Sequence, residues 1–427
     1  MRVSILVVLA AFLGSDAAPA PAPPAPRWFK GNTHTHTLWS DGNDFPEMVV
    51  DWYRKQGYQF LVLSDHNVVL RGQRWMQTQV VEKRAPGRGA LARYQKRFGA
   101  DWVELRERGG QQQVRLKPLA EFRPRFEKPG EFLLIEGEEI TDSFKRKPIH
   151  INALNLEELI KPRKGKSIRD TMRNNLRAVQ AQAAKAGKTI IAHLNHPNYG
   201  WGVTAEDLAY VLEDRFFEVY NGHPGVRHTG DALHASVERM WDVVNTIRVG
   251  ILKAKPMLAV ATDDSHHYHG RGTVTSGRGW IQVRSRSLAP DAIMEAMNRG
   301  DFYASSGVTL SDLRYDAEAR TLTVAIDSKP NVTYEIRFSG TRRDWDRASY
   351  PIVNVNGVEL HATRRYSKDV GALFATVRGD RASYQLKGDE LYVRATVVSS
   401  RPHPNASFKG QVEEAWTQPV GWEKAVR

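Results

Sequence analysis

The chain has 427 residues, more than one compact core usually holds, so we expect two domains. It contains no cysteine, which excludes disulfide bonds, thiolate metal sites and cysteine nucleophiles. The formal net charge is +13, and most of it lies in residues 71–130, where 15 Lys or Arg stand against 6 Asp or Glu. Such a segment could attract phosphates, nucleic acid or an acidic surface. Because no nucleic-acid-binding motif accompanies it, we favour a solvated basic insertion.

The N-terminal residues are typical of a secretory signal peptide. Arg2 precedes an apolar stretch over residues 3–13 that is too short to span a bilayer, and Ser15-Asp16-Ala17 supplies small residues for cleavage. We therefore expect a signal peptide over residues 1–17, cleaved near Ala17, and a Pro/Ala-rich linker over 18–27. A retained anchor is the alternative, which the short apolar run disfavours. The protein is expected to be periplasmic or secreted, with no membrane span.

Strands and helices then alternate along the chain, which favours an α/β fold with a parallel sheet or barrel. Residues 45–56 form the first expected helix, because Phe45, Met48 and Trp52 fall on one stripe. The apolar run 60–63 is typical of a buried strand and ends in Ser64-Asp65-His66. After the insertion, the expected strands are 132–135, 150–154, 189–192, 216–220, 256–261 and 280–283, and the expected helices are 168–186, 232–249 and 290–298.

The character of the sequence changes near Ser306. Helical periodicity disappears, and short alternating runs such as 321–326, 334–338 and 391–397 follow. This pattern is typical of a small antiparallel sheet or sandwich. We therefore expect an α/β domain over residues 28–305, which contains the basic insertion 71–130, and a smaller all-β, sandwich-like domain over 306–427.

Histidines and carboxylates gather at the ends of the expected strands. All but two of the 14 histidines precede residue 270. In His34-Thr35-His36, a strand would point both imidazoles to one face, and Asp41 lies in the turn just beyond. Functional groups of α/β folds collect at the carboxyl ends of strands, and imidazole with carboxylate is the ligand set of zinc, manganese or iron. The strand-end candidates are His34, His36, Asp41, His66, Glu139, His150, His193 or His196, Asp264 and His266.

Six blocks of the sequence occur in an order that resembles the PHP (polymerase and histidinol phosphatase) superfamily of metallohydrolases. The blocks are HTHT..SDG, SDH, GEEI, HINALN, NHP and DDSH, and they lie between Trp28 and Tyr303. The tail at Ala415-Trp416-Thr417-Gln418-Pro419 resembles, more weakly, a secreted subgroup that includes carbamate and aryl-ester hydrolases. The resemblance implies a distorted (β/α)7 barrel with two or three divalent metal ions at the carboxyl ends of its strands.

The resemblance also implies how the ligands are shared among the metals. Glu139 is preferred to Glu138 because the family's glutamate follows the glycine, here Gly137, by two residues. His196 is preferred to His193 because it precedes a proline. The long insertion after His66 departs from compact members of the family and puts substrate access in question. The implied sets are His34, His36, Glu139 and Asp264 for one metal; Glu139, His150 and His196 for a second; and Asp41, His66 and His266 for a third.

Such a cluster predicts a hydrolase in which a metal-bound hydroxide is the nucleophile. The metals would be zinc, manganese or iron, since a His/Asp/Glu set accepts all three. The leaving group could receive its proton from Asp65, Asp263, His193 or His267. Asp65 and Asp263 could equally orient ligand imidazoles, and His223 could contact substrate or be structural.

Four functions fit this sequence to different degrees. The first hypothesis is a phosphoesterase for a small-molecule or nucleotide-like ester, which the superfamily and the basic insertion support. An ester or carbamate hydrolase on the same cluster fits the signal peptide and the β tail. A non-catalytic envelope-binding protein would need a degenerate metal set, and an amidohydrolase barrel is disfavoured by the pair Asp264 and His266. A phosphate site also needs cations at its mouth, and the candidates are Arg71, Arg74, Arg227, Arg271 and Arg278.

Overall fold

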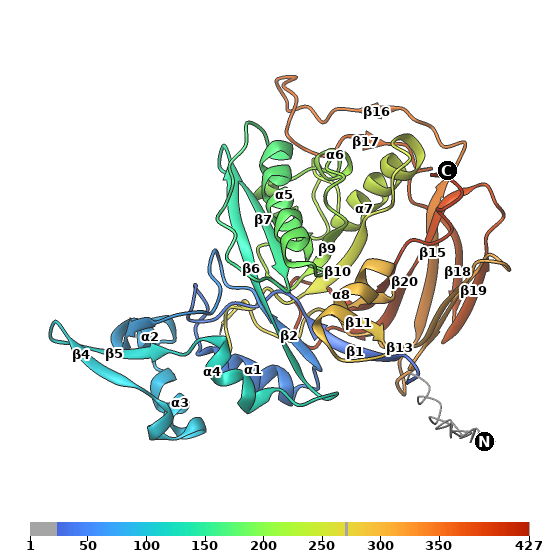
Figure 1. Ribbon diagram of the computed structural model, residues 1–427. Helices are drawn as coiled ribbons and strands as arrows, with labels where there is room; N and C mark the ends of the chain where they lie inside the picture. The colour runs from blue at the N-terminus through green and yellow to red at the C-terminus, as the bar shows by residue number, and fades with distance from the viewer. Residues whose placement is uncertain (1–23, 270–271, 427) are drawn as a thin grey trace, which may run out of the picture.

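The computed structural model describes residues 24–269 and 272–426. The expected signal peptide and most of the expected linker lie outside these residues. Figure 1 shows an α/β body in the centre, the insertion projecting to one side and a β-rich C-terminal part on the other. Among the described helices, none is long and apolar enough to cross a membrane.

Seven strands of the α/β body lie side by side in chain order. The pairs β1–β2, β2–β6, β8–β9 and β9–β10 are parallel. Strand β7 is antiparallel to both of its neighbours, β6 and β8, so the sheet is mixed. The bounds are β1 Arg27–Asn32, β2 Phe60–Leu63, β6 Leu133–Phe144, β7 Lys147–Leu154, β8 Ile191–Leu194, β9 Phe216–Asn221 and β10 Leu258–Thr262.

The two outer strands of this series are linked just beyond their carboxyl ends. Thr35, after β1, forms an isolated parallel bridge with Ser265, after β10. The Asp264 N–H donates to the His34 carbonyl, and the His36 N–H donates to the Ser265 carbonyl, both at 3.0 Å. His34 and His36 therefore lie past the end of β1 and not within a regular strand, and these bonds hold them beside Asp264.

Strand β6 is longer than its apolar run predicts. The sequence places a strand end at Glu136–Glu139, but β6 continues to Phe144 because it forms a hairpin with β7 in which Glu139 is opposite Asn152. The polar residues after Ile140 tolerate this pairing because the far end of the hairpin is partly exposed. Glu139 thus projects from the middle of a paired strand, which fixes its backbone more firmly than a loop would.

The expected helices are present, with one shifted boundary. Helix α5 spans the predicted residues, because the Ser167 side chain caps the Asp170 N–H and Gly187 ends it in the left-handed conformation. The helix expected from residue 232 begins only at Val237, since the Asp231 side chain accepts the Leu233 and His234 N–H groups in a competing turn. The bounds are α1 Pro46–Lys55, α5 Ile168–Ala186, α6 Ala205–Tyr210, α7 Val237–Asn245, which continues into the π-helix η3 Thr246–Ile251, and α8 Pro290–Arg299.

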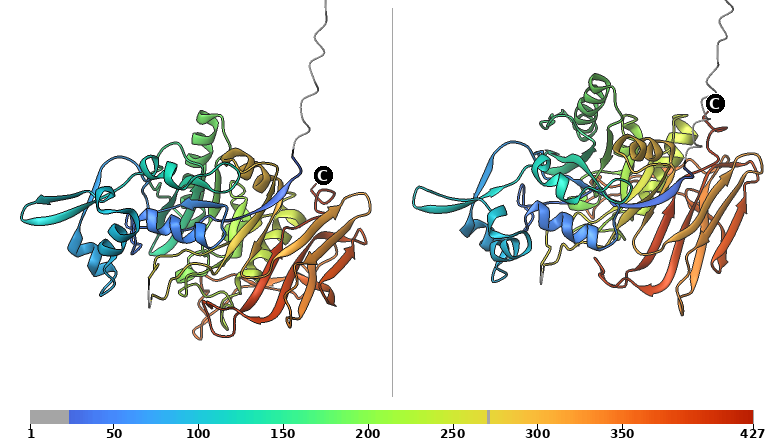
Figure 2. Two further views of the ribbon diagram at one scale, coloured as in Figure 1. Left: turned by 90° about the horizontal axis from the view of Figure 1, so that it is seen from below. Right: turned by 60° about the horizontal axis from the view of Figure 1, so that its bottom comes forward.

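The basic insertion contains helices and also a three-stranded antiparallel sheet, β3–β5–β4, which the sequence does not predict. Its guanidinium groups lie over aromatic rings: Arg106 is 4.0 Å from the Trp75 ring centre and Arg125 is 4.3 Å from that of Trp102. Figures 1 and 2 show it extending away from the body. The bounds are β3 Arg74–Gln77, α2 Thr78–Arg84, α3 Ala90–Phe98, η1 Ala100–Trp102, β4 Leu105–Arg108, β5 Gln111–Leu116 and α4 Leu119–Phe126.

The C-terminal part is built of strands, as its alternating runs predict. Four of its strands extend the sheet of the α/β body through β11 and β12, in the order β11–β12–β21–β20–β15–β18, and β13–β14–β19 form a second sheet. Apolar side chains such as Val324, Phe338 and Val397 form one buried core in this part. The bounds are β11 Trp280–Ser285, β12 Phe302–Ser305, β13 Leu310–Asp316, β14 Thr321–Ile326, β15 Tyr334–Arg342, β16 Ser349–Tyr350, β17 Arg365–Tyr366, β18 Ala372–Arg378, β19 Arg381–Gln385, β20 Glu390–Pro402 and β21 Val412–Thr417.

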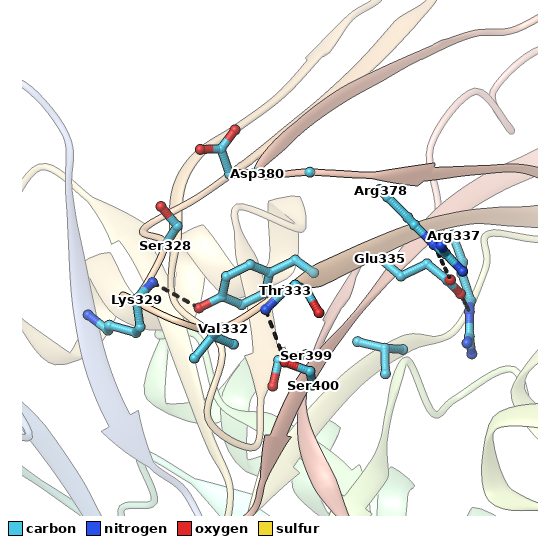
Figure 3. A pocket seen from close by; sticks show the side chains of 13 residues that line it. Ser328, Lys329, Val332, Thr333, Glu335, Arg337, Arg378, Asp380, Ser399 and Ser400 are labelled. Atoms are coloured by element: carbon cyan, nitrogen blue, oxygen red, sulfur yellow. Dashed lines mark hydrogen bonds and ion pairs between the residues drawn. The ribbon is translucent and has the colours of Figure 1, made fainter.

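A cavity of about 740 Å³ opens on this C-terminal part (Figure 3). Its lining includes Lys329, Glu335, Arg337 and Arg378, and the Lys329 N–H donates to the Tyr334 hydroxyl at 3.1 Å. None of the residues that line this cavity is a histidine. The cavity is therefore separate in its chemistry from the histidine-rich strand ends.

A buried ion pair joins the α/β body to the C-terminal strands. Arg394 of β20 is 2% exposed. Its guanidinium donates to both carboxylate oxygens of Asp242 on α7, at 2.9 and 2.8 Å, and to Glu238 at 2.8 Å. Bidentate pairing satisfies the charges that burial would otherwise leave uncompensated.

Replacement of Arg394 by methionine should lower the free energy of unfolding by about 3–5 kcal/mol, because two carboxylates lose their buried partner. Urea unfolding measures this change. Arg337→Met is the matched control, since Arg337 bonds Glu335 from a half-exposed position and its loss should cost less than about 1 kcal/mol. Equal effects of the two substitutions would contradict the assigned role of Arg394.

Candidate metal centre

Glu139 lies at the centre of the histidine cluster. Side chains alternate along β6, so the neighbouring Glu138 points to the opposite face. Glu138 accepts the Ile160 N–H at 2.6 Å, and burial raises the pKa of Glu138 to about 8. Glu139 is fully buried among imidazoles from four other segments of the chain. The two adjacent glutamates therefore have different surroundings, and only Glu139 can contact the cluster.

In a first set of side chains, the imidazole nitrogens of His34 and His36 lie at similar distances from the carboxylates of Glu139 and Asp264. His34 Nε2 and His36 Nε2 are each 3.4 Å from Glu139 Oε2. The same two nitrogens are 3.3 and 3.1 Å from Asp264 Oδ1. Ligand atoms about 2.1 Å from a tetrahedral ion stand about 3.4 Å apart. The spacing of this set therefore suits one divalent cation.

The other imidazoles that face Glu139 come from β7 and from the segments that follow β2 and β8. His150 Nδ1 is 3.0 Å and His196 Nε2 is 3.5 Å from Glu139 Oε1. His66 Nδ1 is 2.7 Å from Glu139 Oε2. The two oxygens of Glu139 thus face different groups of nitrogen atoms, an arrangement in which one carboxylate can bridge two cations.

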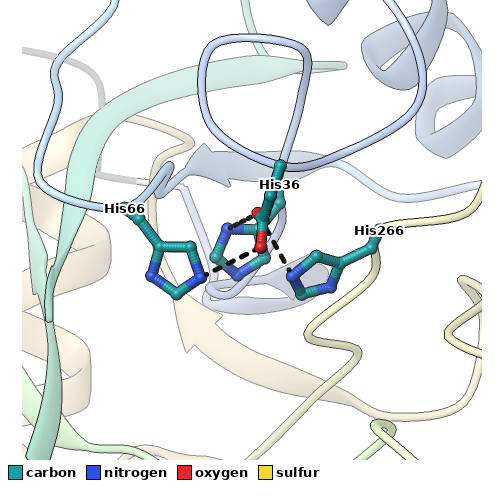
Figure 4. Close-up of side chains that lie close together, drawn as sticks. His36, His66 and His266 are labelled. Carbon is teal, nitrogen blue, oxygen red and sulfur yellow. Dashed lines mark ion pairs between the residues drawn. The ribbon is translucent and has the colours of Figure 1, made fainter. Parts of the chain in front are cut away.

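Asp41 forms the outer corner of the cluster. Its carboxylate lies 3.3 Å from His266 Nε2, 3.6 Å from His66 Nε2 and 3.7 Å from His36 Nδ1. Figure 4 shows the three imidazoles converging on this carboxylate. The Asp41 side chain is 54% exposed, whereas that of His36 is fully buried. A cation held here would be the one most accessible from solvent.

The electrostatics of the cluster keep its carboxylates ionised. Burial opposes ionisation of Glu139, but His66, His34 and His150 outweigh it and hold the pKa of Glu139 well below its usual range. Burial likewise opposes ionisation of Asp41, while His266 and His66 lower its pKa. Burial, with nearby His266 and His66, lowers the pKa of His36 to about 3. Ionised carboxylates and neutral imidazole are the forms that bind metal.

The unpaired polar atoms of the cluster fit a bound cation. His34 Nε2, Glu139 Oε2 and His150 Nδ1 are buried and lie close to other atoms of the cluster, but none of them makes a hydrogen bond of good geometry within the described residues. Buried polar atoms are normally paired. Because these three atoms belong to the inward-facing set, divalent cations among them would satisfy all three.

Glu218 orients this cluster, although the sequence analysis did not single it out. On β9, its Oε1 lies 2.7 Å from His34 Nδ1, and its Oε2 accepts the His196 N–H at 2.8 Å. Burial opposes ionisation, yet His34 lowers the pKa of Glu218 to about 2. The bond to Nδ1 leaves His34 Nε2 directed at Glu139. The available signal was a glutamate inside the apolar run 216–220.

Two of the expected proton donors, Asp65 and Asp263, hold neighbouring segments of the chain in place. Asp65 accepts the Thr37 N–H at 2.8 Å and the Ser40 hydroxyl at 2.6 Å, which fixes the loop that carries Asp41. Asp263 accepts the Tyr53 hydroxyl at 2.7 Å and three backbone N–H groups of residues 277–279. Both are fully buried and neither lines the cavity beside the cluster.

Of the three remaining histidine candidates, two line the cavity beside the cluster and one does not. His193 is buried, lies 3.2 Å from the Thr33 hydroxyl and does not line the cavity. His267 lines the cavity, and its Nδ1 accepts the Val274 N–H at 3.1 Å. His223 also lines the cavity, and its Nδ1 accepts the Gly225 N–H at 2.9 Å. In both residues the neutral ring must therefore carry its proton on Nε2.

The cavity beside the cluster has a volume of about 330 Å³. Among the described residues, no Lys or Arg lines it. Arg71 bonds Glu136, and Arg278 is buried with its guanidinium on the Gly222 and Thr273 carbonyls. Arg74 lies over the Trp39 ring, Arg227 lines an adjoining cavity, and Arg271 lies outside the described residues. The lining is Asp41, His66, Glu139, His150, His196, Tyr199, His223, Asp264, His266, His267 and Val274.

Glu139→Gln should lose bound metal after reconstitution and dialysis, because an amide cannot bridge two cations as a carboxylate does. Elemental analysis measures the metal content of each variant. Glu138→Gln is the matched control on the neighbouring residue and should keep the native content. Equal metal content in the two variants would rule out Glu139 as a ligand.

Glu218→Gln should weaken metal binding by about 10–100-fold, since His34 loses the carboxylate that orients it. Competition with a chromogenic chelator gives the affinity. Glu213→Gln, which removes a carboxylate that pairs with Arg177, should leave metal affinity unchanged. A Glu218 variant with native affinity would show that its contact with His34 does not affect the ligand.

Comparisons with known proteins give low sequence identities. No family model matches the chain, and no curated protein matches it. One similar solved structure is a two-domain protein from Bacteroides vulgatus that contains a predicted PHP-like metal-dependent phosphoesterase, with 14% identity, 95% of this chain and 100% of that chain covered and a TM-score of 0.40. Others are PsfC from Pseudomonas syringae, with 11% identity, 63% and 87% covered and a TM-score of 0.34, and an amidohydrolase from Chromobacterium violaceum with bound sulfate, with 14% identity, 57% and 93% covered and a TM-score of 0.27.

Proposed function

We propose that the chain is a PHP-type metal-dependent hydrolase that cleaves phosphate esters. The observation that carries the proposal is the fully buried Glu139, with its two oxygens facing separate groups of imidazoles. The six ordered sequence blocks support the family, and the parallel strands with His34 and Asp264 joined at their ends support a distorted seven-stranded barrel. The N-terminal sequence supports export to the periplasm or the exterior.

The residues that would hold the metals are those whose nitrogen and oxygen atoms converge. His34, His36, Glu139 and Asp264 form the first set; Glu139, His150 and His196 form the second; and Asp41, His66 and His266 form the third. Divalent cations of zinc, manganese or iron in these sets would supply a hydroxide nucleophile at neutral pH and neutralise negative charge on the substrate. A phosphoryl group offers several oxygens to neighbouring cations, whereas a carbonyl offers one, so the number of sets favours a phosphate ester.

His267 is the residue that we propose as proton donor to the leaving group. It lines the cavity, whereas Asp65, Asp263 and His193 do not, and as imidazolium its ring can give up one proton and remain a neutral imidazole. Asp65 and Asp263 then act as positioning residues: Asp65 fixes the Asp41 loop, and Asp263 ties residues 277–279 to Tyr53. His193 supports the segment before His34 through Thr33.

Asp264→Ala should abolish hydrolysis of nitrophenyl phosphate by the metal-loaded protein, because the first ligand set loses its carboxylate. The assay follows nitrophenolate release, with circular dichroism to verify folding. His361→Ala, a histidine outside the cluster, is the control and should retain native activity. Full activity in a folded Asp264 variant would refute the ligand assignment.

His267→Ala should discriminate between leaving groups. The alkoxide that leaves an alkyl phosphate is a strong base and needs a proton, so kcat for alkyl phosphates should fall about 10²-fold or more. Nitrophenyl phosphate has a stable leaving anion, and its kcat should change little. His223→Ala is the matched control on the same cavity. Equal losses on both substrates in the His267 variant would exclude it as the proton donor.

A carboxylic ester or carbamate hydrolase on the same cluster is the second candidate. The observation that favours it is that no Lys or Arg of the described chain lines the cavity beside the cluster. Nitrophenyl phosphate, acetate and carbamate, compared at equal concentration, separate the two candidates. The larger kcat/KM for the phosphate is the expected result, and cleavage of the acetate or carbamate alone would replace the first proposal by the second.

A further inference from the structure

A second and larger cavity adjoins the metal centre. It has a volume of about 870 Å³, against about 330 Å³ for the cavity beside the cluster. His150 and Tyr199 line both cavities, so the two cavities adjoin one another at these side chains. A molecule with one end at the metal centre and a chain long enough to pass these side chains would have its other end in the larger cavity.

Three cationic side chains line this larger cavity and come from three separate segments. Arg146 lies in the turn between β6 and β7, Lys164 in the loop before α5, and Arg227 in the segment after β9. None of the three has a carboxylate within salt-bridge distance in the described part of the chain. The one acidic residue of the lining, Asp142, has its oxygens occupied by the Ser143 N–H at 2.7 Å and the Asn175 amide at 3.2 Å. The lining therefore carries three cations against one carboxylate, and its net charge is positive.

Arg146 lies in a turn whose backbone conformation is strained for a residue with a long side chain. Phe144 pairs with Lys147, so Lys145 and Arg146 are the two central residues of a hairpin turn. Their φ angles are +45° and +64°, in the left-handed region that Asn and Gly occupy with less strain. Strain retained at two adjacent residues points to a role for the side chains rather than for the turn.

Arg227 is held in place by a neighbouring aromatic residue. Its guanidinium lies 4.8 Å from the ring centre of Trp201, and that ring stacks on His234 at 3.8 Å between centres. The stack limits the positions of an otherwise exposed side chain. A cation oriented in this way loses less conformational freedom when it binds an anion.

We propose that the larger cavity binds a second anionic group of the substrate while the ester to be cleaved lies at the metal centre. The substrate class is a small phosphate ester whose alcohol portion carries a further phosphate, sulfonate or carboxylate. This inference rests on the proposed function for the position of the first phosphate. Arg146, Lys164 and Arg227 contact the second anionic group, and Tyr199 forms the wall between the two positions.

Non-hydrolysable phosphonates test this inference by binding rather than by activity. Calorimetry compares butylphosphonate with the butane bisphosphonate that carries a second phosphonate at its far end, both with metal-loaded protein. Either end can occupy the metal centre, so statistics alone favour the bisphosphonate by a factor of about two. The expected preference is about tenfold or more beyond that factor, and it should shrink at high salt because exposed charges are screened.

Single substitutions assign the preference to the cavity. Arg146→Ala, Lys164→Ala and Arg227→Ala should each reduce it by about two- to fivefold and leave butylphosphonate binding unchanged. Lys161→Ala is the matched control, since Lys161 is an exposed cation of the same loop as Lys164 but does not line the cavity. Replacement of Lys145-Arg146 by Asn-Gly should raise Tm and lower the preference together, which separates loss of the charge from loss of the fold.

The results distinguish the second anion site from the proposed hydrolysis of phosphate esters. Equal affinity for the two phosphonates after the statistical correction, or an equal loss in the Lys161 variant, would overturn the second anion site. A preference that depends on the three cations, without hydrolysis of any phosphate ester, would refute the proposed reaction and leave the anion site standing. Failure of both phosphonates to bind would overturn both claims.

Discussion

The contact on which the site depends is that of one buried carboxylate with the imidazoles around it. An isolated buried carboxylate is costly, but Glu139 is surrounded by histidines that hold it ionised. His150 approaches it from β7, and His34 and His196 approach it from the segments that follow β1 and β8. The bridge between Thr35 and Ser265 brings Asp264 to the same place. Burial lowers the pKa of His34 and His66, but Glu139 and the neighbouring carboxylates outweigh it and raise both pKa values, so divalent cations would take the place of these protons.

Much of the fold can be predicted from the periodicity and end signals of the sequence. Where the prediction fails, the cause is a contact or an exposed surface that periodicity does not record. Helix α5 is predicted to its end residues because Ser167 and Gly187 are local signals. The helix at Val237 starts late because the Asp231 side chain makes a competing turn, which a periodicity argument does not detect. The strands of the insertion give only a short apolar signal: β5 begins with Gln111, Gln112 and Gln113 and alternates only at its end, where Val114 and Leu116 are buried.

The candidate site, too, can be predicted from the sequence only in part. Gathering of histidines at one edge can be expected from strand ends, but the direction of each side chain depends on contacts between distant segments. Glu218 lies within an apolar run and was not predicted as a site residue, because its bond to His34 Nδ1 joins positions 184 residues apart in the sequence. Asp65 and Asp263 stand next to strand ends, yet each turns toward backbone donors and away from the cavity. Arg278, a candidate phosphate ligand, is instead occupied by carbonyls and by Asn405 of the C-terminal part.

The most direct measurement of the central claim is anomalous X-ray scattering from crystals of the metal-loaded protein, recorded on both sides of the absorption edge of the metal. We expect at least two difference peaks that share Glu139 as a ligand, one of them contacting His34, His36 and Asp264 and another contacting His150 and His196. A protein that binds no metal at Glu139, or metal only at sites remote from it, would contradict the account.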